Sequence, residues 1–340
     1  MTQKFAFWPH TKNKNIASFR LRCLNVIRGL SDQITVSFYS NTIIPKKLIL
    51  SKRYDKKTVL KAIELRRKHR VGVYIDLCDN HFYYERNDAV AVKRAVQLRD
   101  AISVVDGVTV SSEYLKKIVL DQVPDVKFIE VIDDVIDLPV PPNFISYISN
   151  PYNAFLLIFI KFWLRKKNGK LHLVWFGNHS GGFSEGGMDS ILEIVSILNK
   201  YRSSITLTVI SNSRAHYRLL SNRFEFESNY IPWNVVFFDK ALQLHDAVLI
   251  PVKKNPFNFA KTSNRVATSL LNGLQVIADS IPSYQEFENN IFLDDYDKAL
   301  NALIQKAKRP QKEWVGFFQK KNADVLNKWK SFLLEDRSNE

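Results

Sequence analysis

The sequence predicts an α/β protein with parallel sheets, divided into two domains. Strand-like apolar runs alternate with amphipathic helical segments along the whole chain, which is typical of parallel sheets covered by helices. A chain of 340 residues is longer than a domain with a single hydrophobic core usually is, and it suits two domains of about 150 residues each. A Pro-rich stretch at 137–153 marks the boundary between them.

The first half alternates regularly between the two kinds of element. Short apolar runs predict buried strands at 33–40, 47–54, 71–78, 107–113 and 127–134. Segments with a 3.6-residue apolar period predict helices at 20–30, 57–70 and 89–103. We therefore expect a first domain over residues 1–150.

The second half begins with a strand that runs into a glycine-rich loop. The strand at 171–177 is followed by the loop "NHSGGFSEGG" and a helix at 188–201. Further strands are predicted at 204–212, 246–252 and 274–279. We expect a second domain over 151–312 and a helical tail over 313–340. Two successive units of this kind place a ligand in a cleft, at the carboxyl ends of the strands.

The chain is strongly basic, with 49 Lys and Arg against 34 Asp and Glu, a net charge of +15. Such a balance favours an anionic partner, although dense basic groups at 46–53, 56–70 and 161–170 also fit solvated helix faces. A nucleic-acid-binding protein is one alternative, but no helix-turn-helix, zinc finger or RNA-stacking motif is visible, so nucleic acid is not the expected partner. The two cysteines, Cys23 and Cys78, predict no disulfide framework and suit a reducing compartment.

The apolar run at 154–164 bears on the relation to membranes. It is about half the length that spans a bilayer, it contains Lys161, and the N-terminus lacks a signal-peptide pattern. We expect either a soluble cytoplasmic protein or one that contacts a membrane only at its surface. The apolar body and basic end of "FLLIFIKFWLRKK" fit docking on an anionic membrane, and they fit a core or interdomain helix as well.

A helix that begins near Lys261 has an unusual start. Its first turn and the residues just before it bring two cations and two hydrogen-bond donors, Lys261, Ser263, Asn264 and Arg265. A helix N-terminus already favours anions, so the segment predicts a phosphate site. A capping Ser or Thr flanked by solvated cations is the alternative interpretation.

Several segments together resemble the GT-B glycosyltransferases, close to glycosyltransferase family 4. The segment "NFAKTSNRVATSLLNGLQVIADSIPSYQEF" resembles the donor-site segment of that family, and "LVWFGNHSGGFSEGGMDSILEIV" resembles the start of its C-terminal domain. "VYIDLCDNHF" is similar to the strand whose end carries a His near the sugar. The resemblance implies two Rossmann-like domains facing a central cleft, with C-terminal helices. It also implies sugar transfer from a phosphate-activated donor to a glycan or lipid-linked glycan in bacterial surface polysaccharide assembly, with no cofactor.

The resemblance and the residues together predict the site. We expect Lys261, Arg265 and His81 to be catalytic, with the two cations holding the leaving phosphate. The expected donor-binding residues are Gly177, Ser180, Gly181, Gly182, Arg214, Ser263, Asn264, Ser280 and Glu286. The expected acceptor-binding residues are Arg20, Arg22, Asp76 and Asp79. No His/Cys/Asp cluster has convincing metal spacing, so we expect a metal-independent and retaining reaction.

Two departures from the family pattern leave more than one candidate for the sugar donor. The family carries two Glu residues eight positions apart, and Ala260 and Thr268 stand at those positions here. The candidates are a nucleotide-sugar, a cytidine monophosphate-linked acidic sugar and phosphoribosyl pyrophosphate. A catalytically inactive scaffold is a further alternative, whereas a dinucleotide oxidoreductase would need a Gly-x-Gly-x-x-Gly turn that is missing after the first strand.

Overall fold

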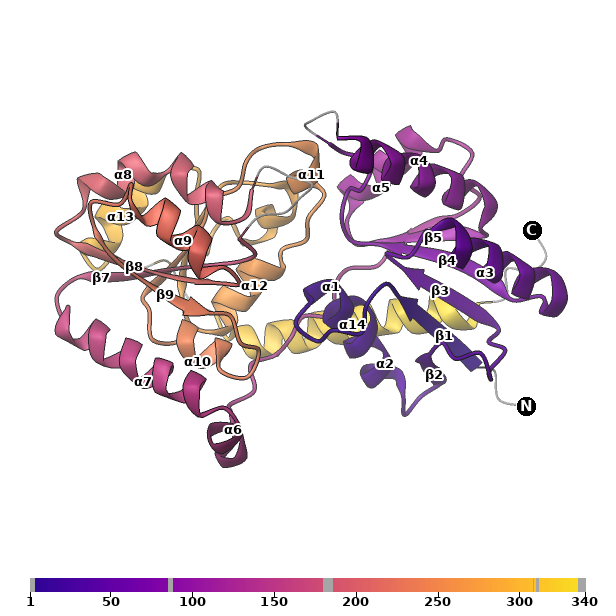
Figure 1. The fold of residues 1–340 in the computed structure, drawn as a ribbon, viewed down its shortest axis with the longest axis horizontal. Helices are drawn as coiled ribbons and strands as arrows, with labels where there is room; N and C mark the ends of the chain where they lie inside the picture. Colours follow the sequence, from indigo (N-terminus) through magenta and orange to yellow (C-terminus); the bar gives the residue numbers. More distant parts are fainter. Residues whose placement is uncertain (1–3, 85–87, 180–185, 308, 310–311, 336–340) are drawn as a thin grey trace. The chain divides into compact units, whose positions relative to one another are not determined.

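The computed structural model describes residues 4–84, 88–179, 186–307, 309 and 312–335, which fold into two compact units (Figure 1). Unit 1 comprises Met1–Asp137, Asn255–Asn264 and Gly316–Glu340, and unit 2 comprises Leu138–Lys254 and Arg265–Val315. Each unit holds a six-stranded sheet in which every pair of neighbouring strands is parallel. The predicted α/β class with two Rossmann-like sheets is confirmed.

The sheet of unit 1 has the order β2-β1-β3-β4-β5-β6. Its strands are β1 (Lys4–Pro9), β2 (Thr35–Phe38), β3 (Lys47–Ser51), β4 (Gly72–Leu77), β5 (Gly107–Val110) and β6 (Ile129–Val131). Because β2 and β3 lie on opposite sides of β1, the direction of winding reverses there. In open α/β sheets ligands bind outside the carboxyl ends of the strands at such a reversal.

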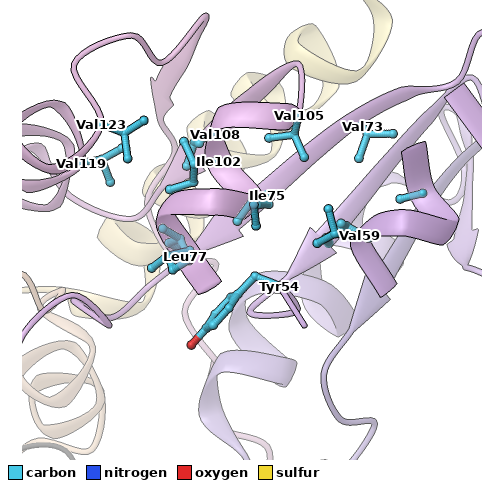
Figure 2. Close-up of a cluster of buried hydrophobic side chains, with 14 of the residues drawn as sticks. Tyr54, Val59, Val73, Ile75, Leu77, Ile102, Val105, Val108, Val119 and Val123 are labelled. Carbon is cyan, nitrogen blue, oxygen red and sulfur yellow. The ribbon is translucent and has the colours of Figure 1, made fainter. Parts of the chain in front are cut away.

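Three helices cover one face of this sheet, α3 (Lys56–His69), α4 (Ala89–Val104) and α5 (Glu113–Gln122). Each begins at a side-chain cap, provided by Asp55, Asp88 and Ser112 respectively, which accounts for where it starts. Figure 2 shows the core between the sheet and these helices, in which residues of β4 such as Ile75 and Leu77 contact apolar residues of the helices.

The opposite face of the sheet carries α1 (Ala17–Phe19), the π-helical turn η1 (Arg20–Leu24) and α2 (Asn25–Leu30). The last helix of the chain, α14 (Trp314–Leu334), also packs there through Trp329, Phe332 and Leu333. Successive strand residues point to opposite faces, so Phe5 and Phe7 reach this second core while Ala6 reaches the first.

The sheet of unit 2 has the order β12-β11-β10-β7-β8-β9. Its strands are β7 (Leu171–Phe176), β8 (Ile205–Ser211), β9 (Glu227–Pro232), β10 (Ala247–Ile250), β11 (Gln275–Ala278) and β12 (Phe292–Leu293). The winding reverses at β7, whose neighbours are β8 and β10. The carboxyl ends of β7 and β10 are therefore the expected ligand position in this unit.

Helices cover both faces of this sheet as well. The turn η2 (Gly187–Glu193), α8 (Val195–Lys200), α9 (Arg214–Ser221) and α13 (Tyr296–Ile304) share one core with the strands. Helices α7 (Pro151–Lys166) and α10 (Phe238–Leu242) lie on the other side of the sheet (Figure 1). The remaining elements are α6 (Phe144–Ser149), α11 (Pro256–Phe259), α12 (Asn264–Leu271) and η3 (Pro282–Phe287).

The elements differ from the sequence prediction in a few places. Strands β1, β9 and β12 were not predicted, and α6 and the start of α7 lie in the stretch that was predicted to be an irregular linker. The segment predicted as a separate C-terminal tail forms the single helix α14, most of which belongs to unit 1. Among the described residues, none of the helices combines the length and the apolar character needed to cross a bilayer.

Candidate functional site

Polar residues gather at the carboxyl edge of the sheet in unit 1. His10 follows β1, Lys52 follows β3, and Asp79 lies two residues beyond β4. Main-chain hydrogen bonds align the strand ends, because His10 N donates to Ser51 O at 3.0 Å and Lys52 N donates to Asp76 O at 2.9 Å. The edge at which the winding reverses therefore carries two potential cations and a carboxylate.

The imidazole of His81 lies in this cluster and is almost completely buried. Its Nδ1 is 2.8 Å from the hydroxyl of Tyr54, and its Nε2 is 4.0 Å from Oδ2 of Asp79. Burial, together with the positive charge of Lys52, lowers the pKa of His81 to about 3. Burial also raises the pKa of Tyr54 to about 12. Both groups are uncharged near neutral pH and act as hydrogen-bonding groups.

Asp79 carries the negative charge of the cluster. Burial alone would raise its pKa, but Lys52, whose Nζ lies 2.5 Å from Oδ2, and then His81 and Lys261 lower the pKa below its usual value. The structure thus brings three of the predicted residues into one electrostatic group, since His81 and Lys261 both act on this carboxylate. The Nζ of Lys261 also lies 4.8 Å from the ring centroid of Phe257.

The segment Asn255–Asn264, which contains Lys261, belongs to unit 1 rather than to the second sheet. The hydroxyl of Ser112 donates to the carbonyl of Ala260 at 2.7 Å, and Nδ2 of Asn80 donates to the carbonyl of Pro256 at 3.3 Å. The side chain of Ala260 is fully buried in the core of unit 1. This packing accounts for one departure from the family pattern, because a Glu at this position would put a carboxylate into an apolar core.

Arg22 and Asp76, two of the predicted acceptor-binding residues, are paired with each other inside unit 1. Both side chains are 0% exposed, and the guanidinium lies 2.5 Å from the carboxylate. The carboxylate also accepts hydrogen bonds from Ser51 and Thr109, each at 2.9 Å, and the guanidinium lies 3.6 Å from Asp134. We therefore assign Arg22 and Asp76 to the interior of unit 1 and not to acceptor binding.

Three other predicted residues of unit 1 have identifiable contacts. Arg20 Nε donates to Asp137 at 2.9 Å and its NH1 donates to the carbonyl of Lys14 at 2.7 Å. Ser263 is buried, and Nδ2 of Asn264 lies 3.5 Å from the carboxylate of Asp134. Burial raises the pKa of Asp134 to about 6. Thr262 Oγ1 also donates to this carboxylate at 2.7 Å, so Asp134 contacts the chain just before and at the start of α12.

In unit 2 the predicted cation Arg265 reaches the end of β7. Its NH2 donates to the carbonyl of Phe176 at 2.6 Å, and its guanidinium carbon lies 5.4 Å from the ring centroids of Trp175 and Phe176. Gly177 follows directly. A Cβ at Gly177 would approach the ring of Trp175 to 2.9 Å and NH2 of Arg265 to 3.7 Å, so a glycine leaves room for this arrangement.

The guanidinium of Arg265 has no carboxylate partner among the described residues, and its buried Nε has no hydrogen-bond acceptor there. Burial lowers its pKa, which the nearby Tyr284 and Tyr296 oppose. Arginine remains protonated even so. The sheet of unit 2 thus has a cation with an unused donor at the point where its winding reverses.

The other predicted donor residues lie at the same edge or near it. Arg214 is the first residue of α9, which follows β8, and it is exposed, with its guanidinium carbon 5.7 Å from the ring of Tyr230. Ser280 follows β11 and donates from Oγ to Asp294 at 2.6 Å. Glu286 lies exposed in η3. Ser180, Gly181 and Gly182 lie outside the described residues.

Several residues at these edges were missed by the sequence prediction. In unit 1 they are His10, Lys52 and Tyr54, and in unit 2 they include His179, whose Nδ1 lies 3.0 Å from Oδ1 of Asn212. In the structure all of them follow a strand end within a few residues. The sequence offered this signal for His179, which follows the strand predicted at 171–177. It did not offer the signal for His10, because β1 was not predicted, or for Lys52 and Tyr54, which lie inside the strand predicted at 47–54. Within the described ranges, no group of three or more His, Cys, Asp or Glu residues has a geometry that could hold a metal ion.

Comparison with known proteins finds no matching family model and no matching curated sequence, but solved structures match most of the chain. A glycosyltransferase from Rickettsia africae ESF-5 aligns over 100% of this chain and 99% of its own, with a TM-score of 0.61 and 11% identity. WaaG, a glycosyltransferase involved in lipopolysaccharide biosynthesis, aligns over 98% and 100%, with a TM-score of 0.56 and 11% identity.

A mutant of TarM from S. aureus, in complex with fondaparinux, α-GlcNAc-glycerol and UDP, aligns over 91% of this chain with a TM-score of 0.57 and 13% identity. The present chain covers 58% of TarM. These neighbours share the arrangement of two parallel sheets described above. The chain therefore has the fold of the GT-B glycosyltransferases.

Proposed function

We propose that the protein is a glycosyltransferase that moves a sugar from a phosphate-activated donor to a glycan or lipid-linked glycan. The fold supports this class of reaction, and the residues at the two sheet edges supply groups that the reaction needs. Unit 2 is proposed to bind the donor and unit 1 to bind the acceptor.

The observation that carries the proposal is the environment of Arg265. Arg265 is half-buried, and its buried Nε has no acceptor among the described residues. A cation held in this way without a carboxylate partner is costly, and an anionic ligand would offset that cost. Arg265 lies at the reversal of the sheet of unit 2, where open α/β sheets bind ligands. An arginine grips two oxygens of a phosphate through parallel hydrogen bonds, so a diphosphate is the ligand that fits this position.

The edge of unit 1 offers groups that suit a sugar acceptor. Asp79 is ionised, so its carboxylate is able to accept hydrogen bonds from the hydroxyl groups of a sugar. His81 is uncharged and is able to hydrogen-bond a hydroxyl without adding charge. Lys261 is proposed as a positioning cation that keeps Asp79 ionised. Arg20 remains a candidate for an acceptor phosphate, at the rim of the same unit.

We propose that the transfer is retaining and that the protein supplies the necessary positive charge. The bond between the anomeric carbon and the phosphate oxygen breaks, and the acceptor oxygen bonds to that carbon from the same face. The acceptor proton passes to the departing phosphate oxygen, so no additional base is required. Arg265 stabilises the negative charge that develops on the phosphate, which is the main catalytic contribution expected of a fixed cation.

The donor that we favour is a uridine diphosphate-sugar, because the structure of the TarM mutant contains UDP. The family's ribose-binding Glu is replaced by Thr268, which is partly exposed on α12, so a cytidine monophosphate-linked acidic sugar and phosphoribosyl pyrophosphate are the competing donors. For the acceptor we propose a precursor of a surface polysaccharide, a class to which the role of WaaG in lipopolysaccharide biosynthesis also points.

A thermal-shift panel tests the donor site directly. Ligand binding to the native state raises the melting temperature, so the panel should include UDP, cytidine monophosphate, phosphoribosyl pyrophosphate and adenosine diphosphate. We expect UDP to raise the melting temperature of the wild type and to have little effect on Arg265→Gln. Arg202→Gln is the matched control, since Arg202 is exposed and pairs with Glu225 at the opposite end of β8. An equal shift in all three proteins would refute the role of Arg265.

A catalytically inactive scaffold is the second candidate, favoured by the absence of both family Glu residues at Ala260 and Thr268. It predicts that UDP binds but that no UDP is released from a UDP-sugar with any acceptor tested. A nucleic-acid-binding role instead predicts a shift with single- or double-stranded oligonucleotides that falls with salt. Oligonucleotides added to the panel, together with a separate assay of UDP release, distinguish these outcomes.

A further inference from the structure

Helices α6 and α7 of unit 2 present an apolar face to solvent. The exposed large side chains on α7 are Tyr152, Phe155, Ile158, Phe159 and Phe162, and those on α6 include Phe144, Ile145 and Ile148. Phe155 is 64% exposed and Phe144 is 78% exposed. Soluble proteins rarely expose a contiguous group of this kind without a binding role.

The spacing along α7 shows that this is a second face and not the core-facing one. Tyr152, Phe155, Phe159 and Phe162 recur at intervals of three and four residues, so they form one stripe on the helix. Ile160 and Leu164 form the buried stripe that packs in unit 2. A helix that is apolar on all sides normally lies inside a protein, but α7 lies at the surface of unit 2 (Figure 1).

Cations border the outer stripe. Lys161, Arg165 and Lys166 lie on the exposed side of α7, and Nζ of Lys166 lies 4.7 Å from the ring centroid of Phe162. None of these three has a carboxylate partner among the described residues, whereas Lys167 and Lys170, which follow the helix, both pair with Glu227. The sequence contains no Asp or Glu between positions 138 and 184, so the face has no negative charge of its own.

We propose that the outer face of α6 and α7 is a docking surface for a membrane that contains anionic lipids. A surface helix with aromatic and aliphatic residues on one face and Lys or Arg beside them is the type that inserts into the headgroup region of a bilayer. The three cations complement anionic headgroups. A second copy of this chain would offer no carboxylate on the same face to pair with them.

The consequence is that unit 2 would lie against the membrane surface. The protein would then encounter a lipid-linked acceptor by diffusion along the membrane surface and not by diffusion through solution. The inference concerns binding alone and does not depend on sugar transfer, because it is tested without donor or acceptor. Its failure would leave the proposed reaction untouched, and loss of the reaction would leave the binding intact.

Co-sedimentation of the full-length chain with vesicles tests the proposal. We expect binding to vesicles of phosphatidylcholine mixed with phosphatidylglycerol, and much weaker binding to phosphatidylcholine alone. The doubly substituted Phe155→Ser/Phe162→Ser should lower the partition coefficient at least about tenfold, because two exposed rings no longer enter the apolar region. Substitution of Lys161, Arg165 and Lys166 by Gln should lower it about fivefold for each charge and should remove the salt dependence.

Two control variants and a measurement of size complete the design. Leu219→Ser, at an exposed apolar residue of α9, and Arg202→Gln, at an exposed cation, should bind as the wild type does. All substituted positions are exposed, so the melting temperature should not change. Failure of the wild type to bind either vesicle, or equal binding by all variants, would overturn the proposal. A wild-type dimer in light scattering that becomes a monomer in Phe155→Ser/Phe162→Ser, without vesicle binding, would identify the face as a contact between two copies.

Discussion

Two charged pairs in unit 1 illustrate how position decides the role of a single residue. Lys52 and Asp79 lie just beyond strand ends, and both remain partly open to solvent. Arg22 and Asp76 are chemically similar, but Asp76 lies within β4 and Arg22 within η1, and water is excluded from both. Each pair joins a basic residue, Lys or Arg, with an aspartate. Only the boundaries of β4 and η1 show that Arg22 and Asp76 lie in the interior, whereas Lys52 and Asp79 lie at the edge of the sheet.

The neutral state of His81 leads to a prediction about pH. Its pKa is lowered to about 3 by burial and then by Lys52, so the folded protein binds fewer protons than the unfolded chain below the unfolded pKa of about 6.5. The stabilisation is therefore complete above that pH and is lost as the pH falls towards 3. Between pH 6.5 and 5 the wild type should lose up to about 2 kcal/mol of stability relative to His81→Gln.

Urea unfolding of both proteins at a series of pH values measures this difference. Taking the difference between the two proteins removes the contributions of the other buried histidines, such as His245, whose pKa burial also lowers. Parallel stability curves for the wild type and the variant would contradict the prediction. They would mean that His81 is protonated in the folded state or that it is solvated.

At the scale of elements, the segment between β10 and α12 determines how the site departs from the family pattern. Asn255–Asn264 is fixed to unit 1 by Ser112 and Asn80, and Ala260 fills part of the core. Thr268, the other altered position, lies one to two turns into α12 and is partly exposed. The two departures therefore have different physical environments, although they look alike in the sequence.

A matched pair of substitutions tests this difference. Ala260→Glu places an unpaired carboxylate in the core and should cost roughly 3–5 kcal/mol of unfolding free energy. Thr268→Glu, at a partly exposed helical position, should cost about 1 kcal/mol or less. Denaturant unfolding of both variants measures the two costs. Equal costs would mean that Ala260 is not held in the core of unit 1.

The elements also show what a sequence can and cannot predict. Strands such as β4 and β8 were predicted because their long apolar runs leave no other assignment, and the helix at α12 was predicted from its apolar period. β9 was missed because "ESNYIP" is largely polar, as an edge strand can be. For the site, Arg265 and Gly177 were predicted together and lie together. The pairing of Arg22 with Asp76 was not predicted, because it depends on contacts between distant segments, which periodicity does not reveal.

At the scale of the whole molecule, the two units are not two successive pieces of sequence. The chain leaves unit 1 after Asp137, returns for Asn255–Asn264, and returns again at Gly316. Helix α14 begins in unit 2, where the ring of Trp314 lies 5.9 Å from that of Phe287, and ends in unit 1, where Trp329 is fully buried. The period of a helix identifies its apolar face but not the unit against which that face packs, so the predicted boundaries at 150 and 312 could not anticipate this path.

The divided membership of α14 predicts that its two tryptophans stabilise different units. Trp329 packs edge-on against Phe7 at 5.3 Å and lies beneath the guanidinium of Arg22. Trp329→Ala should therefore destabilise unit 1 by about 3–5 kcal/mol, and Trp314→Ala should destabilise unit 2 by a comparable amount. Hydrogen exchange measured on peptides locates each effect, because protection should fall in β3 and β4 for the first variant and in β7 and β8 for the second. If both substitutions weakened protection only in the sheet of unit 2, the C-terminal return of the chain to the first sheet would be refuted. If both weakened it only in the sheet of unit 1, the start of α14 would not belong to unit 2.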